Sequence, residues 1–111
     1  MMKKIVKTIS LKSDPQLIHE YCKIHQDIWP EIKEGIKLAG IDNMEIYLHG
    51  SIAVMIVEMD DNLNPDVVFD KLAKYPRQEE WEAYVSKFQE CYESDTSAEK
   101  WKEMDKIFSL K

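Results

Sequence analysis

The chain has 111 residues, of which 44% are hydrophobic and 32% are charged. This length and composition predict a single domain over residues 1–111 with a modest hydrophobic core. The net charge of −6, with Arg77 as the single arginine, argues against nucleic acid and other anionic partners, because phosphate recognition needs clustered basic side chains.

The sequence carries no clear signal for membrane insertion, secretion or redox chemistry. No apolar run approaches the ~20 residues that a transmembrane helix needs. The first ten residues, MMKKIVKTIS, alternate in polarity and lack the continuous apolar stretch of a signal peptide. Cys22 and Cys91 form no C-x-x-C pair, so both are predicted to be free thiols. We therefore expect a cytoplasmic protein without a membrane partner.

The first third of the chain predicts a strand followed by helical segments. Residues 3–11 alternate and are rich in β-branched side chains, which is typical of a strand. Asp14 is followed by proline, a strong signal for a helix N-cap and first turn. The helix is expected to span 15–29 and to be kinked or succeeded by a second helix at Pro30, with Gly40 as its C-cap.

The middle of the chain predicts a β-hairpin, with strands at 43–49 and 52–60 joined by a turn at Gly50. In the first strand, Met44 and the residues two and four positions later face one side, and Tyr47 faces the other. The second strand is apolar on both faces, which indicates that both faces are covered.

The last third predicts two helices, at 66–75 and 78–90, separated by Pro76. A surface loop is expected at 91–100, and the apolar residues of 101–110 suggest a final strand.

The resulting order, β-α-β-β-α-β, is that of a ferredoxin-like α+β fold. Such a sheet carries helices on one face only, so its other face needs a cover. A second copy packed sheet to sheet, forming a dimeric α+β barrel, would provide it. We therefore expect a homodimer, with the cavity between sheet and helices as the candidate site.

The most informative stretch is YCKIHQDIWPEI, residues 21–32, because it places Tyr21, His25 and Trp29 at i, i+4 and i+8. On a helix these positions share one face. A phenol, an imidazole and an indole on one stripe would suit a small polar ligand and proton transfer near neutral pH. The alternative is that the two large aromatic residues simply pack in the core.

Other features narrow the chemistry. The chain has no glycine-rich phosphate loop and no H-E-x-x-H motif, and His19 and His49 are too far from His25 in pattern to suggest a metal site. We expect neither a metal nor a cofactor. Tyr47, on the adjoining strand, could take part in proton transfer together with His25. Trp81 could stack on a sugar ring or serve as a packing residue.

These residues resemble one known family. The run Y-x-x-x-H-x-x-x-W-P-E at 21–31, the pair Ile46-Tyr47 and the pair Glu80-Trp81 are similar to the L-rhamnose mutarotase family. The closing run K-W-x-x-M-x-K-I-F at 100–108 resembles one branch of it. The resemblance covers essentially the whole chain.

The resemblance implies a cofactor-independent, dimeric enzyme of the cytoplasm that interconverts the α and β anomers of a 6-deoxy monosaccharide, most simply L-rhamnose. It implies that His25 is the proton donor, that Tyr21 and Tyr47 bind the sugar, and that Trp81 lies in the segment contacting substrate. Trp29 is a further candidate from the aromatic stripe. Better-known members carry adjacent tryptophans where this chain has Glu80-Trp81, so the identity of the sugar stays open.

Two alternatives remain at this point. A cofactor-independent monooxygenase of the dimeric α+β barrel type would need a larger, more apolar cavity. A non-enzymatic binding module would have a fully packed His25 and no cavity.

Overall fold

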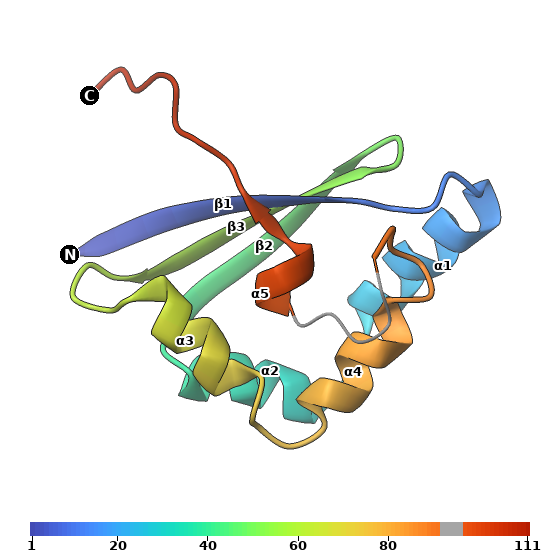
Figure 1. Ribbon diagram of the computed structural model, residues 1–111, viewed down its shortest axis with the longest axis horizontal. Coiled ribbons are helices and arrows are strands. Elements are labelled where there is room, and N and C mark those ends of the chain that lie inside the picture. Colours follow the sequence, from blue (N-terminus) through green and yellow to red (C-terminus); the bar gives the residue numbers. More distant parts are fainter. Residues whose placement is uncertain (92–96) are drawn as a thin grey trace.

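The computed structural model describes residues 1–91 and 97–111. In these residues a four-stranded antiparallel sheet has the strand order β2-β3-β1-β4, and the helices lie on one of its faces (Figure 1). The strands are β1 (Met2–Ser10), β2 (Ile41–His49), β3 (Ile52–Asp60) and β4 (Lys102–Glu103). The helices are α1 (Pro15–Gln26), α2 (Pro30–Leu38), α3 (Pro65–Leu72), α4 (Gln78–Val85) and α5 (Ser97–Lys100). The predicted order of the four strands is confirmed, whereas the short helix α5 differs from the loop predicted there.

Two of the helices begin as their sequences indicate. The Asp14 side chain accepts a hydrogen bond of 2.9 Å from the backbone N–H of Gln16, which confirms the predicted N-cap of α1. Asn64 caps α3 in the same way, through the backbone N–H of Asp66 at 2.9 Å. A proline occupies the first helical position in both, where no backbone donor is lost.

The first helix is shorter than predicted. It ends at Gln26, where the N–H of Asp27 donates to the carbonyl of Ile24. Trp29 has the extended backbone (φ −57°, ψ 134°) that a residue before proline favours, and it is the N-cap of α2. The prediction of one helix over 15–29 is therefore wrong, and Trp29 does not share the helical stripe of Tyr21 and His25.

The predicted hairpin is confirmed, with Gly50 at φ +61° in the tight turn between β2 and β3. One irregularity follows the start of β2, where Ile41 pairs with Met59 but Asn43 pairs with Glu58. This register shift is a β-bulge at Asp42, which places two successive polar residues at the start of the strand.

The end of the chain differs most from the prediction. Helix α4 stops at Val85 rather than at residue 90, and residues 97–100 form a short helix rather than a loop; positions 92–96 of the predicted loop lie outside the described residues. The final strand is only two residues long. After the Met104 N–H donates to the Val6 carbonyl at 2.7 Å, the chain leaves the sheet as an extended tail (Figure 1).

The core lies between the sheet and its helices. Alternate β3 side chains are buried there, and their β1 and β2 partners share this face; the buried β3 residues are Ala53, Met55, Val57 and Met59. The opposite face carries Val54 and Ile56 and has no helix over it (Figure 1). Within the described part of the chain, every helix is too short or too polar to cross a bilayer.

Candidate active site

Two adjoining cavities lie between the sheet and the helices, as expected. The inner cavity has a volume of about 50 Å³, and the outer one, of about 370 Å³, opens toward α2 and the start of β2. Five residues line both: His25, Ile28, Ile36, Met44 and Ile46. His25 is therefore placed where the two cavities meet, and it is the titratable group that they share.

The orientation of His25 is fixed by its own helix. Its Nδ1 lies 2.8 Å from the backbone carbonyl oxygen of Tyr21, one turn earlier. Because a carbonyl oxygen can only accept, Nδ1 carries a hydrogen and donates it. In the neutral ring Nε2 is then left with a lone pair available to a ligand. Burial lowers the pKa of His25 from its usual 6.5, an effect that the bond to the Tyr21 carbonyl partly opposes.

Tyr21 is buried, with 3% of its surface exposed, and its hydroxyl oxygen accepts a hydrogen bond of 3.1 Å from Nε2 of Gln89. Burial raises the pKa of Tyr21 to about 12, while the bond from Gln89 acts in the opposite direction. The phenol is therefore protonated at neutral pH. Its O–H group can therefore donate a hydrogen bond, but it does not act as a base.

Aromatic rings enclose His25 on one side. The ring of Trp81 stands edge-on to His25, with centroids 5.6 Å apart, and Trp81 lines the inner cavity. The ring of Trp29 stands edge-on to Trp81, with centroids 5.1 Å apart, and stacks on Tyr84, with centroids 5.8 Å apart. Trp29 lines neither of the two cavities in the described structure, so within this chain it supports Trp81 rather than facing the ligand.

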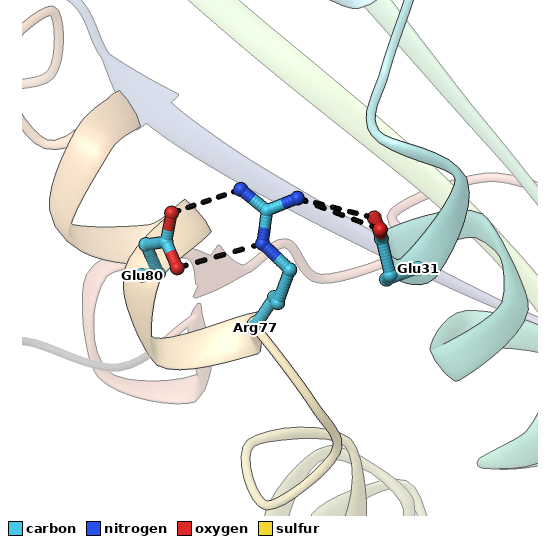
Figure 2. Close-up of polar contacts among 3 residues, drawn as sticks. All are labelled: Glu31, Arg77 and Glu80. Atoms are coloured by element: carbon cyan, nitrogen blue, oxygen red, sulfur yellow. Dashed lines mark hydrogen bonds and ion pairs between the residues drawn. The ribbon is translucent and has the colours of Figure 1, made fainter.

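An ion-pair bridge holds these aromatic residues in place. Arg77 lies between Glu31 at the start of α2 and Glu80 in α4 (Figure 2), with N–O distances of 3.4 and 2.9 Å. Its guanidinium also covers the ring of Trp29 at 4.2 Å. Arg77 has a left-handed backbone with φ 66°, which is unusual for a residue with a side chain. Glu80 is thus turned toward Arg77 and does not line the cavities at His25.

Tyr47 is separated from the other candidates. It pairs with Val54, whose side chain lies on the sheet face away from the helices, and 56% of its surface is exposed. Its neighbour Ile46 points the other way and lines both cavities. The structure therefore brings together Tyr21, His25 and Trp81, with Trp29 behind them, and it does not bring Tyr47 to His25 within one chain.

The comparisons with known proteins show which family the chain belongs to. The sequence model of the L-rhamnose mutarotase family matches residues 4–110. An L-fucose mutarotase of Xanthomonas campestris pv. campestris is 31% identical, with 98% of this chain and 89% of that protein aligned. The chain belongs to the L-rhamnose mutarotase family. It is thus a sugar mutarotase, an isomerase, as the resemblance of the Tyr21–Glu31 run implied.

Other proteins similar to this chain carry different names. An L-rhamnose mutarotase of Listeria monocytogenes is 32% identical over 69 residues, which is 60% of this chain and 62% of that protein. A Dictyostelium discoideum protein named UPF0734 is 30% identical, with 97% and 90% aligned. The fold matches the crystal structure of an L-rhamnose mutarotase from Formosa agariphila with a TM-score of 0.68 at 12% identity, covering 98% and 99% of the two chains.

Sequence reasoning missed several cavity residues of this family member. The inner cavity is lined by polar or aromatic residues that no spacing connects to His25: Gln78, Gln89, Lys100 and Trp101. The outer cavity has polar residues at its rim: Lys33, Lys37, Asp42 and Asn43. The alternation of side chains along β2 could have indicated Met44 as a cavity residue, because Met44 and Ile46 were expected on one face of this strand. The resemblance singled out Trp101 as part of a closing motif without giving it a role.

Proposed function

We propose that this mutarotase interconverts the α and β anomers of a 6-deoxy aldose, with L-rhamnose as the first choice and L-fucose as the second. The observation that carries the proposal is His25, fixed through Nδ1, with Nε2 available where the two cavities meet. The outer volume of about 370 Å³ is in the range of small-molecule sites. Both sugars are supported by the names of relatives, one an L-fucose and the other an L-rhamnose mutarotase.

The proposed chemistry is proton transfer at the anomeric centre. Nε2 of His25 accepts the proton of the anomeric hydroxyl and then delivers it to the ring oxygen, as the bond between the anomeric carbon and the ring oxygen breaks. The open aldehyde rotates before the steps reverse. The lowered pKa of His25 makes the neutral ring the main form near pH 7. A neutral Nε2 must accept a proton before it can donate one. Since both oxygens are bonded to the same carbon, one nitrogen can serve them in turn.

Tyr21 has a binding role in this proposal. With a pKa of about 12 it is a poor acceptor of the anomeric proton, and its O–H is suited to donate to a sugar oxygen. Trp81 provides the flat apolar wall beside His25. For Tyr47, sugar binding stays a prediction from the resemblance, because its side chain lies on the other face of the sheet.

We also propose that two copies form the dimeric α+β barrel. The sheet face without helices carries Val54, Ile56 and Tyr47, and Ile52 at its edge is 50% exposed. The tail adds further exposed apolar side chains, with Ile107 95% and Phe108 72% exposed. Burial of both surfaces against a second chain would remove a large apolar area from water.

The catalytic role is tested by anomer exchange in saturation-transfer NMR, with L-rhamnose and then L-fucose. Replacement of His25 by Ala should lower the rate by ~10²–10⁴-fold, the usual contribution of a positioned acid–base group. His19→Ala is the matched control, because His19 is exposed on the same helix. A His25→Ala variant with a near-normal rate would refute the assignment. A wild-type protein that accelerates exchange of no 6-deoxy sugar would refute the proposed substrate class.

A further inference from the structure

Gln78 is a buried polar residue whose hydrogen bonding is incomplete. It is the first residue of α4, only 4% of its surface is exposed, and its side-chain Oε1 has no hydrogen-bond partner in the described structure. Buried acceptors are nearly always paired, because the water that they lose on folding must be replaced. An unpaired one is costly to the fold and needs an explanation.

The position of Gln78 suggests what pairs with it. Gln78 lines the inner cavity together with His25, Tyr21 and Trp81. Several other polar groups of this cavity have partners within the described protein. The Tyr21 hydroxyl accepts from Gln89, and Lys100 Nζ donates to the Glu82 carbonyl at 3.1 Å and to Ser86 Oγ at 3.3 Å.

The volumes of the two cavities limit what can reach Gln78. At about 50 Å³ the inner cavity has room for a group the size of a hydroxyl or a water molecule, whereas the outer one can hold a sugar ring. A ring in the outer cavity, with its anomeric carbon near His25, can extend one substituent into the inner cavity. Sugar hydroxyls donate hydrogen bonds, and a neutral carboxamide oxygen accepts them without a charge to desolvate.

Resting on the proposed mutarotase function, we propose that Gln78 is a substrate-binding residue whose Oε1 accepts a hydrogen bond from one hydroxyl of the bound sugar. This residue therefore contributes to the choice of sugar, because a site built to pair with a hydroxyl rejects analogues that lack it. The stability lost through the unpaired acceptor in the free protein is recovered in the complex.

The test compares Gln78→Met, which keeps the size of the side chain and removes the acceptor, with Gln16→Met at an exposed position of α1. We expect Gln78→Met to raise KM for the sugar about tenfold or more with little change in kcat, since the bond is present in both ground and transition states. Its Tm should stay equal to that of the wild type or rise, because an unpaired acceptor has been removed. Gln16→Met should change neither kinetic constant.

A series of monodeoxy analogues of the accepted sugar provides a second measurement on the wild-type protein. One of them should lose about the same factor in kcat/KM, and Gln78→Met should not discriminate against that analogue any further. An unchanged KM in Gln78→Met, with the wild type active, would overturn the inference and leave an internal water as the partner of Gln78. A wild type inactive on every 6-deoxy sugar would instead overturn the mutarotase proposal and this inference together.

Discussion

At the scale of single residues, the site depends on how each side chain is hydrogen-bonded. The carbonyl of Tyr21 fixes the tautomer of His25, and Gln89 fixes the direction in which the Tyr21 hydroxyl can donate. The first bond is partly buried and the second is buried, and both partners come from the protein itself. The same burial moves the two pKa values apart, downward for the imidazole and upward for the phenol. Of these two side chains, His25 is therefore the one that we propose exchanges protons near neutral pH.

The lowered pKa of His25 predicts the pH dependence of both activity and stability. The neutral ring is the form that first accepts a proton, so kcat/KM should be level near pH 7 and fall on the acid side, with its midpoint below 6.5. In the unfolded chain His25 binds its proton more readily, so its contribution to stability is present above pH 6.5 and is lost as pH falls through the lower folded value. Exchange rates from pH 4.5 to 8, with the His25→Ala background subtracted, test the first statement. An acid limb centred above 6.5 would contradict it.

At the scale of elements, short helices and their ends position the site. Helix α1 carries Tyr21 and His25 one turn apart. Because this helix ends at Gln26, Trp29 lies outside it and packs against Trp81. Arg77 then ties the start of α2 to α4 on the outside of these rings. The ion pairs are exposed and each is worth little by itself. The stacking on Trp29 and the planar fork of the guanidinium make this a positioning contact that a lysine would not reproduce.

The Asp14 cap predicts a measurable part of the stability of α1. Asp14→Ala should lower the free energy of unfolding by about 1 kcal/mol, because the Gln16 N–H loses its acceptor. Asp14→Asn keeps a side-chain oxygen in place and should lose much less. Urea unfolding measures the free energy of unfolding of the two variants. At temperatures well below the Tm, both variants should keep the kcat of the wild type. Equal losses in the two variants would show that the side-chain hydrogen bond is not what matters.

At the scale of the whole molecule, the sheet separates the side that carries the helices and the candidate site from an apolar side without helices. The cavities, His25 and the helices lie on one face; Tyr47 and Val54 lie on the other. The binding-module alternative required a packed His25 without a cavity, whereas His25 lines two cavities in the structure. After β4, which pairs with the edge of β1, the exposed tail runs away from the sheet (Figure 1).

The proposed dimer predicts a specific effect of charge on the sheet face without helices. Val54→Glu should convert a dimer into a monomer, because the carboxylate would be buried without a partner in the interface. Val67→Glu is the matched control, since Val67 is 59% exposed on α3. Size-exclusion chromatography with light scattering measures the mass, and circular dichroism checks the fold. A wild-type monomer, or a dimer that persists in folded Val54→Glu, would contradict the barrel.

Local sequence signals by themselves determined much of this protein. Asp14 before a proline marked the start of α1, Gly50 marked the hairpin, and the run from Tyr21 to Glu31 indicated the family. These signals suffice because caps, turns and short motifs depend on residues adjacent in the chain. Only the tertiary structure decided the length of the last strand, since strand pairing depends on a partner that the local pattern does not show.

The candidate site likewise combines residues that the sequence predicts with residues that only the tertiary structure brings together. Helical spacing predicted that Tyr21 and His25 lie together, because i and i+4 meet on any helix. It failed for Trp29, where the pre-proline backbone ends the helix first. Helical spacing gave no signal for Gln78, Gln89 or Trp101, which line the same cavity as His25 only because the sheet and helices pack around it. The sequence by itself determined the family and the candidate acid–base residue, and the packing of distant segments decided which groups surround that residue, because burial and unpaired acceptors exist only once the chain has folded.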